Sequence, residues 1–308
     1  MTKQYPLPLV TVICTCYNHA QYVEEAIYSV LNQTYPNIQL IVVDNASQDE
    51  SVAKINDLLL RFPNIQFIPN KTNIGICKAF NNAVKLATGK YLIDLAADDV
   101  LCLDRIALQV SAFEKLPDRF GILYSNVEEI TPIGKHLCFS IKPENAPGGE
   151  IFGQLLEKHF LPSPSTMFKK EVFDSLGGYN ESLAFEDFDY WVRCARNHHF
   201  HYLDIISTKK RILPHSLSSQ FQSVQQSERM LASTYETFLW AKGHIRNEIE
   251  KKSLAQGISY YFRQSVLLRH FEIANKFREI TPLPFHPKTL LADCLFFFHQ
   301  LHRRLFTY

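Results

Sequence analysis

Short apolar segments alternate with amphipathic ones over the first 130 residues. Four nearly continuous apolar runs, rich in β-branched residues, predict strands; they cover residues 9–15, 39–44, 65–68 and 91–96. The segments between them carry apolar residues three and four positions apart, which predicts helices; they lie around residues 23–31, 51–61 and 78–87. Apolar strands between amphipathic helices predict an α/β fold, with a mostly parallel central sheet flanked by helices.

The pattern changes in the second part of the chain. Residues 132–164 hold more glycine and proline, which indicates loops around a short helix near residues 152–158. A further strand is expected at residues 165–170 and a helix at 186–197, and helical periodicity dominates from about 221 to 305. We therefore expect an α/β domain over residues 1–219 and a helical C-terminal appendage over residues 220–308.

Composition narrows the class of protein. The 308 residues are 46% hydrophobic and 20% charged, which is ordinary for a globular chain of about two domains. A formal charge of +1 gives no indication of nucleic acid as a partner. No run of 18 apolar residues occurs, so no membrane-spanning helix is predicted.

The seven cysteines are odd in number and irregularly spaced, and no two form a C-x-x-C pair. This usage favours buried free thiols in a reducing compartment over disulfides or a zinc site. We therefore expect a cytoplasmic protein.

Polar residues follow three of the predicted strands. They are Thr15-Cys16-Tyr17-Asn18, Asp44-Asn45 and Asp98-Asp99. Ligands of parallel sheets bind beyond the carboxyl ends of the strands, so these ends are expected to form one site. No G-x-G-x-x-G follows the first strand, and Thr88-Gly89-Lys90-Tyr91 lacks the earlier glycine and the Ser or Thr of a phosphate-binding loop. A glycine-rich phosphate cradle is therefore not expected.

Five segments occur in a characteristic order. They are VTVICTCYNHAQYVEEAIYSVLNQTY, IVVDNASQDES, NIGICKAFNNAVKLATGKYL, an AADD turn, and SLGGYNESLAFEDFDYWVRC. Together they resemble the family 2 inverting glycosyltransferases, which have the GT-A fold, over about residues 8–219. The resemblance implies a donor-binding half at about 8–130 and an acceptor half at about 131–219. It also implies transfer from a nucleotide-diphosphate sugar, with UDP or dTDP favoured, to an acceptor hydroxyl.

The AADD turn resembles the metal-binding element of that family. A departing nucleotide diphosphate carries two negative charges, and Mn²⁺ or Mg²⁺ held by carboxylates neutralises them. Asp98 matches the metal-contacting aspartate, Asp99 follows it, and His215 resembles a histidine that completes the site. Ala96 stands where the family has its first aspartate, so one donor contact is missing. The alternative for the two aspartates is a solvated turn that caps the next helix.

An attacking hydroxyl must also lose its proton to a base. Asp187 matches the catalytic aspartate of the family, and Glu186 is expected to orient the loop or the acceptor. The alternative is a pair of carboxylates favoured by the positive end of a helix.

The remaining matches concern the nucleotide sugar. Thr15, Tyr17, Asn18 and Asp44 resemble residues that hold the base and ribose, Asn73, Gly75 and Asn81 match the next segment, and Arg211 resembles a residue that closes over the diphosphate. Phe80 replaces the usual arginine, and Lys78 is a candidate substitute for the lost cation, although a solvated lysine is the simpler interpretation.

Three functions remain open. The first is a transferase in surface polysaccharide or glycolipid assembly, with a saccharide or lipid-linked acceptor. The second is a nucleotidyltransferase, although CYNHAQY lacks the Gly-rich basic loop of that class. The third is a non-catalytic nucleotide-sugar-binding subunit, which the changes at Ala96 and Phe80 allow.

The end of the chain is apolar and aromatic. Residues 284–308 carry Arg303 and Arg304 beside aromatic side chains, which suits contact with the inner face of a membrane. The same pattern suits packing against the catalytic domain or a second copy of the chain.

Overall fold

The computed structural model describes residues 6–214, 216, 227–280 and 294–297. The chain forms two compact units. The first comprises residues 1–150, 160–182 and 197–213, and the second comprises 151–159, 183–196 and 214–308. The described strands all belong to the first unit.

A mixed sheet forms the centre of the first unit. Its strand order is β3-β2-β1-β4-β8-β6-β9-β5, with β7 paired to β6. The strands are β1 (Val10–Cys16), β2 (Ile38–Asp44), β3 (Gln66–Pro69), β4 (Tyr91–Ala96), β5 (Val100–Leu101), β6 (Phe120–Ile130), β7 (His136–Phe139), β8 (Met167–Lys169) and β9 (His199–Arg211). The neighbours β3, β2, β1 and β4 are all parallel, whereas β8 is antiparallel to both β4 and β6. The predicted mostly parallel α/β sheet is confirmed.

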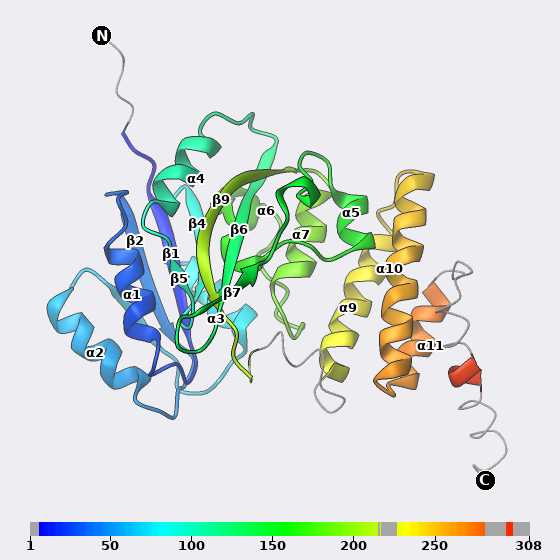
Figure 1. The fold of residues 1–308 in the computed structure, drawn as a ribbon, viewed down its shortest axis with the longest axis horizontal. Helices are drawn as coiled ribbons and strands as arrows, with labels where there is room; N and C mark the ends of the chain where they lie inside the picture. The colour runs from blue at the N-terminus through cyan, green and yellow to red at the C-terminus, as the bar shows by residue number, and fades with distance from the viewer. Residues whose placement is uncertain (1–5, 215, 217–226, 281–293, 298–308) are drawn as a thin grey trace. The chain divides into compact units, whose positions relative to one another are not determined.

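Helices cover both faces of this sheet (Figure 1). One apolar cluster joins alternate residues of β1, β2 and β4 to α1 (Val23–Leu31), α2 (Ser51–Arg61) and α4 (Arg105–Phe113). Residues between them point to the other face, where α3 (Ile76–Val84) contacts β1 and β2 and α6 (Lys170–Ser175) contacts β8. There Phe80 and Phe173 contact Phe168 of β8, with ring centroids 6.3 and 5.5 Å away.

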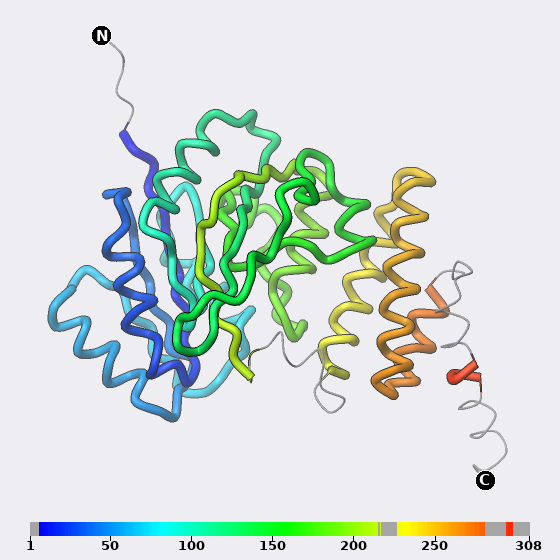
Figure 2. The backbone as a smooth tube through the Cα atoms, viewed as in Figure 1, coloured from blue at the N-terminus to red at the C-terminus, as the bar shows by residue number. Residues whose placement is uncertain are grey.

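The longest strand pairing joins distant parts of the sequence. β9 runs parallel to β6, from His199 opposite Phe120 to Arg211 opposite Ile130 (Figure 2). The alternation of β9 is broken by charged residues and register shifts, so its sequence pattern did not predict a strand. This pairing carries Arg211 to the carboxyl end of β6.

The second unit is helical over the described residues. Its helices are α5 (Phe152–Glu157), α7 (Asp187–Ala195), α9 (Ser227–Lys242), α10 (Glu248–Leu267) and α11 (Phe271–Ile280). Gly257 of α10 permits the closest approach, because a Cβ there would lie 1.9 Å from the carbonyl oxygen of Leu156 in α5. The helices predicted near residues 152–158 and 186–197 therefore belong to the same unit as those of the C-terminal part.

Several expected details differ from the structure. Residues 132–164 contain β7 and two 3₁₀ helices, Pro143–Asn145 and Ser163–Ser165, besides the expected short helix. All seven cysteines are free, but only Cys14, Cys16, Cys77 and Cys194 are buried. Cys102 is half-buried, while Cys138 and Cys294 are exposed, so the expectation of buried thiols is wrong for these three.

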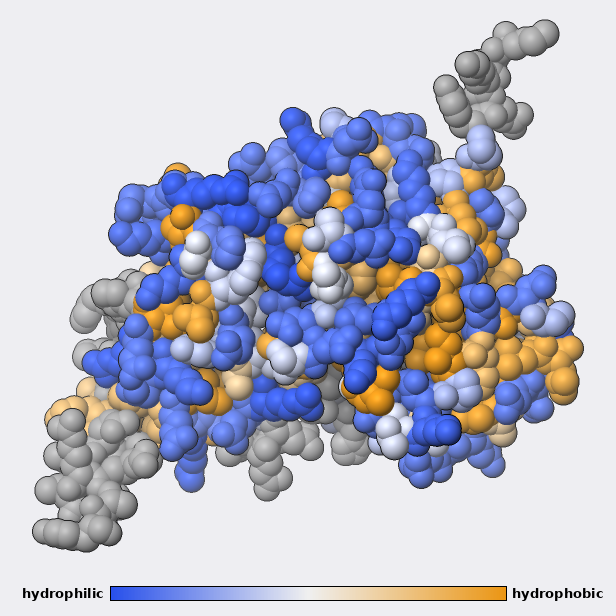
Figure 3. Space-filling model, turned by 180° about the vertical axis from the view of Figure 1, so that it is seen from behind, coloured by the Kyte–Doolittle hydropathy of each residue, from blue (hydrophilic) through white to orange (hydrophobic). Residues whose placement is uncertain are grey.

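Apolar side chains also reach the surface. Figure 3 shows areas of apolar residues among hydrophilic ones on one face. The exposed apolar side chains come from many elements, among them Leu60 of α2, Leu108 of α4 and Ile206 of β9, and scattered residues of this kind are common in globular proteins. Within the described ranges, no helix is long and apolar enough to cross a membrane. The expected membrane-contacting segment, residues 284–308, lies outside the described residues except for 294–297.

Candidate functional site

The carboxyl ends of three parallel strands lie side by side. Cys16 at the end of β1 is opposite Asp44 of β2, and Thr15 is opposite Ala96 of β4. Two backbone bonds continue the contact past the strands, from Asn45 N to Cys16 O at 2.8 Å and from Ala97 N to Thr15 O at 2.9 Å. The polar strand ends therefore form one edge, as their position in the sequence predicts.

Asp44 is the buried carboxylate of this edge. Its side chain is 1% exposed. Oδ2 accepts a 3.0 Å bond from Ser47 N, whereas no described residue donates to Oδ1. An unsatisfied buried carboxylate oxygen is costly, so Oδ1 is suited to accept an N–H or O–H from a ligand.

The loop after β1 is tied to the loop after β2. Asn18 has a positive φ of 57° and accepts a 2.7 Å bond from Gln48 N, while its own N–H donates to Ser47 Oγ at 2.9 Å. His19 N donates to Ser51 Oγ at 3.0 Å. Tyr17 remains 44% exposed. The loop thus presents an aromatic ring on a rigid turn beside Asp44.

Residues before and within α3 contribute hydrogen bonds near this edge. Asn73 Oδ1 accepts bonds from Asn45 Nδ2 and from Gly75 N, both at 3.0 Å, and Gly75 has a positive φ of 83° that suits glycine. Asn81 binds both the N–H and the carbonyl of Tyr179, at 3.0 and 2.8 Å. The Oδ1 of Asn73 and both amide atoms of Asn81 are therefore engaged by the protein, which gives both residues a positioning role.

Phe80 and Lys78 lie on opposite sides of α3. Phe80 is fully buried, and its ring contacts those of Tyr179 at 4.8 Å and Phe173 at 5.7 Å. Lys78 is exposed. The residue that replaces the usual arginine thus belongs to an aromatic core.

The acidic turn Asp98–Asp99 follows β4. Both carboxylates are buried, and Oδ1 of Asp99 accepts the backbone N–H of Arg211 at 2.9 Å. Burial and the nearby charge of Asp98 raise the pKa of Asp99 well above its ordinary value. Asp98 Oδ1 lies 3.8 Å from Nδ1 of His19. Two carboxylates crowded together in a buried turn are stabilised by a positive charge.

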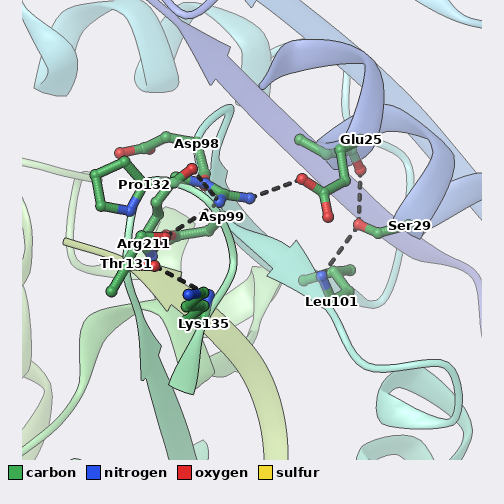
Figure 4. A network of polar contacts seen from close by, with 10 residues as sticks. Glu25, Ser29, Asp98, Asp99, Leu101, Thr131, Pro132, Lys135 and Arg211 are labelled. Atoms are coloured by element: carbon green, nitrogen blue, oxygen red, sulfur yellow. Dashed lines mark hydrogen bonds and ion pairs between the residues drawn. The ribbon is translucent and has the colours of Figure 1, made fainter. Parts of the chain in front are cut away.

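Arg211 holds this turn in place (Figure 4). Its Nε donates to the carbonyl of Asp98 at 3.0 Å, its Nη1 to that of Pro132 at 2.9 Å, and its Nη2 to Glu25 at 2.7 Å. The guanidinium carbon lies 4.5 Å from the ring centre of Tyr22. Arg211 is 4% exposed. Its donors are thus engaged by protein groups in this structure, and it supports the acidic turn.

Helix α1 is fixed to the same turn at a second point. Ser29 Oγ accepts the N–H of Leu101 at 3.0 Å, and Leu101 lies in β5 directly after the turn (Figure 4). Helix α1 therefore binds β5 through Ser29 and reaches the turn through Glu25 and its partner Arg211, one helical turn away.

Glu186 and Asp187 lie at the start of α7 in the second unit. Both side chains are half-buried, and Asp187 Oδ1 accepts the N–H of Phe188 at 2.6 Å. His215, expected to complete the metal site, lies outside the described residues.

A match to a family model identifies the family of this chain. The model of glycosyl transferase family 2 matches residues 11–177, more than half of the chain. The chain belongs to that family. It is therefore a member of a glycosyltransferase family.

Individual relatives agree with this assignment. An uncharacterized glycosyltransferase of Methanocaldococcus jannaschii is 31% identical over 199 residues, which are 64% of this chain and 68% of that protein. TarS of S. aureus, residues 1–349 in complex with UDP-GlcNAc, has a TM-score of 0.68 at 16% identity, over 97% of this chain and 93% of that chain. The mannosyltransferase PcManGT of Pyrobaculum calidifontis, in complex with GDP-Man and Mn²⁺, has a TM-score of 0.60 at 17% identity, over 97% and 81%. These likenesses confirm the GT-A fold of the glycosyltransferase.

The chemistry of the acidic turn fits a divalent cation. Mg²⁺ and Mn²⁺ are bound by one or two carboxylates together with substrate phosphates and water, and Asp98 and Asp99 provide those carboxylates. Across the described part of the chain, no three His, Cys, Asp or Glu side chains are grouped to hold an ion.

Sequence reasoning missed three residues of this glycosyltransferase site. They are His19 beside Asp98, and Tyr22 and Glu25 beneath and beside Arg211. His19 could have been predicted from the sequence, because it follows Tyr17 and Asn18 in the same loop. Tyr22 and Glu25 resemble ordinary polar positions of an amphipathic helix. Their partner, Arg211, lies at the end of β9, which is distant in the sequence.

Proposed function

We propose that this glycosyltransferase moves a sugar from a UDP- or dTDP-sugar to an acceptor hydroxyl with inversion, in a metal-dependent reaction. The observation that carries the proposal is the unsatisfied Oδ1 of buried Asp44 on the same sheet edge as the acidic turn. The N3–H of uracil or thymine is a donor that matches this acceptor.

The donor would lie along the carboxyl ends of the strands. Tyr17 would offer its exposed ring to the base, with Asn18 beside it on the same loop and Thr15 in the preceding strand β1. Asp98 and Asp99 would hold the divalent cation, which would supply charge neutralisation for the leaving diphosphate. The Mn²⁺ of the PcManGT complex supports this assignment of the cation.

Asp187 is the proposed base. Its carboxylate would take the proton of the acceptor hydroxyl as the acceptor oxygen bonds to the anomeric carbon. The bond from that carbon to the diphosphate oxygen breaks, and the nucleoside diphosphate leaves. Attack from the face opposite the leaving group inverts the anomeric centre. Glu186, the adjacent carboxylate, would orient the acceptor.

The test is a donor screen with wild type, Asp187→Asn and Asp57→Asn, in which release of nucleoside diphosphate is followed with simple saccharide acceptors. Asp57 is an exposed carboxylate of α2 and serves as the matched control. The proposal expects at least one donor to be turned over by wild type and Asp57→Asn. It expects Asp187→Asn to bind that donor but to turn it over more slowly, by about 10³-fold or more.

The alternative is a non-catalytic nucleotide-sugar-binding subunit. The absence of a carboxylate at Ala96 is the observation that supports it. Such a subunit would bind a nucleotide at Asp44 without turnover, and Asp187→Asn would behave as wild type.

The acceptor is proposed to be a saccharide or a lipid-linked saccharide of surface polysaccharide or glycolipid assembly. A lipid-linked acceptor would place the protein at the inner face of the membrane. Flotation with anionic liposomes, with and without residues 284–308, tests that location; equal flotation of both forms argues against contact through the C-terminal segment.

A further inference from the structure

The segment that carries the proposed base is bound by helix α9. Ala184, three residues before Asp187, donates its backbone N–H to Ser233 Oγ of α9 at 2.8 Å. Ser233 is buried, and its own hydroxyl donates to the carbonyl of Arg229 at 3.0 Å. That second bond fixes the rotamer of Ser233 and directs a lone pair at Ala184.

Aromatic packing continues this contact through the unit. The ring of Phe188, next to Asp187, lies 5.9 Å from that of Phe238 in α9. Phe238 in turn lies 5.5 Å from Tyr261 of α10, which stacks on Phe277 of α11 at 6.0 Å. Burial first, and the charges of Tyr260 and Asp187 next, raise the pKa of the Tyr261 phenol. The start of α7 therefore packs on α9, and through Phe238 it is linked to aromatic side chains of α10 and α11.

The other end of α7 is held by an ion pair. Arg196 directly follows α7, and its Nη1 and Nη2 donate to the two carboxylate oxygens of Glu250 in α10 at 2.8 and 2.9 Å. Nη1 also donates to the carbonyl of His244 at 3.0 Å, and the guanidinium lies 4.1 Å from the ring centre of Phe152. A bidentate pair of this kind fixes orientation as well as distance.

We infer that α9 and α10 position Asp187 by holding α7 at both ends, with Ser233 as the positioning residue for the segment that leads into α7. Particular side chains of the C-terminal helices then support the base, so these helices are more than an independent appendage. The inference rests on the proposed role of Asp187. It assigns Ser233, Phe238 and Glu250 a positioning task that no motif of the sequence indicates.

The experiment compares Ser233→Ala, Ser233→Thr and Ser265→Ala in the full chain. Ser233→Thr keeps the hydroxyl. Ser265 is the matched control, because it is a buried serine whose hydroxyl binds only the Tyr261 carbonyl of its own helix among the contacts described. Hydrogen exchange of the peptide around Ala184 reports whether Ser233 still holds this segment. The values of kcat and KM for the donor report the effect on the reaction.

We expect exchange around Ala184 to be about tenfold faster in Ser233→Ala, the equivalent of one lost hydrogen bond. We expect kcat to fall about tenfold while KM for the donor is unchanged, since the base is misplaced but donor binding is not. Ser233→Thr should restore both, and Ser265→Ala should change neither.

Unchanged exchange and unchanged kcat in Ser233→Ala would overturn the inference, and so would a loss in Ser265→Ala as large as in Ser233→Ala. If wild type turns over no donor, the proposed function fails on its own. The exchange result then still shows whether Ser233 holds the segment that leads into α7.

Discussion

The backbone N–H of Arg211 donates to Asp99 Oδ1 at 2.9 Å, while the side chain of Arg211 reaches the carbonyl of Asp98 at 3.0 Å. One residue from the end of β9 thus binds both members of the acidic turn, although β4 and β9 are not adjacent in the sheet. The turn is a rigid feature whose shape depends on a distant part of the sequence.

Replacing Arg211 tests this dependence. Arg211→Lys retains a charge but loses the planar guanidinium, which donates to four protein acceptors. We expect it to weaken metal-dependent nucleotide binding about tenfold or more, because buried hydrogen bonds to a charged group are lost. Glu25→Gln should have a much smaller effect, since the Glu25 side chain is 58% exposed and such pairs contribute about 0–1 kcal/mol. Titration of both variants with nucleotide and Mn²⁺ measures the difference, and an equal loss in both would contradict this ranking.

Restoring the usual arginine at position 80 should fail. Phe80 is fully buried among the rings of Phe168, Phe173 and Tyr179. We expect Phe80→Arg to lower the free energy of unfolding by about 3–5 kcal/mol, because a buried charge would have no partner. Phe80→Leu should cost only about 1–2 kcal/mol. Urea unfolding of both variants checks this; a stable Phe80→Arg with tighter nucleotide binding would show that the site can still accept the cation.

Close packing in the helical unit predicts sensitivity at Gly257. A Cβ there would lie 1.9 Å from the carbonyl oxygen of Leu156 and 2.7 Å from the ring of Phe238. Since backbone cannot yield cheaply, we expect Gly257→Ala to cost about 3 kcal/mol or more. Gly243→Ala is the control, because the nearest atom to its Cβ would be 3.5 Å away, and its effect should stay below about 1 kcal/mol. Thermal unfolding compares the two, and similar melting temperatures would be evidence against this contact.

The ion pair of Arg196 and Glu250 predicts a pH dependence of stability. Burial alone would raise the pKa of the Glu250 carboxyl, but hydrogen bonds from Arg196 and from Arg246 N–H outweigh it and lower the pKa below its ordinary value of 4.5. A lowered pKa in the folded state contributes stability above pH 4.5, and this is lost as the pH falls through the folded value. The Arg196–Glu250 pair should therefore stabilise the protein at pH 7 and lose that contribution in acid.

Glu250→Gln isolates this contribution. We expect a loss on the order of 3 kcal/mol at pH 7, because the variant leaves the guanidinium of Arg196 without its carboxylate. The difference from wild type should shrink as the pH falls below 4.5, since wild type then protonates the same group. Urea unfolding at several pH values follows both proteins, and a constant difference down to acid would contradict the assignment to Glu250.

The sequence predicts well where the structure is local. Strands β1, β2 and β4 are continuous apolar runs, and their polar ends meet because parallel neighbours align their carboxyl ends. Strand β9 is different, since its residues alternate irregularly and find their partner in β6 only after the chain has folded back.

The roles of individual residues follow the same division. Asp44 and Asp98 could be placed from strand ends alone. The contacts of Arg211 could not be predicted, because its partners include the carbonyls of Thr131 and Pro132, and any residue supplies a carbonyl. The hydrogen bond between Ser233 and Ala184 could not be predicted either, because one partner is a backbone N–H.

The most direct test of the donor site is isothermal titration of UDP and dTDP, with and without Mn²⁺. It uses wild type, Asp98→Ala, Asp44→Asn and the control Asp57→Asn. We expect wild type and Asp57→Asn to bind one of the nucleotides in a Mn²⁺-dependent manner, Asp98→Ala to lose the metal dependence, and Asp44→Asn to bind more weakly with the dependence intact. Absence of binding to either nucleotide by wild type, with or without metal, or binding that Asp98→Ala leaves unchanged, would contradict the account.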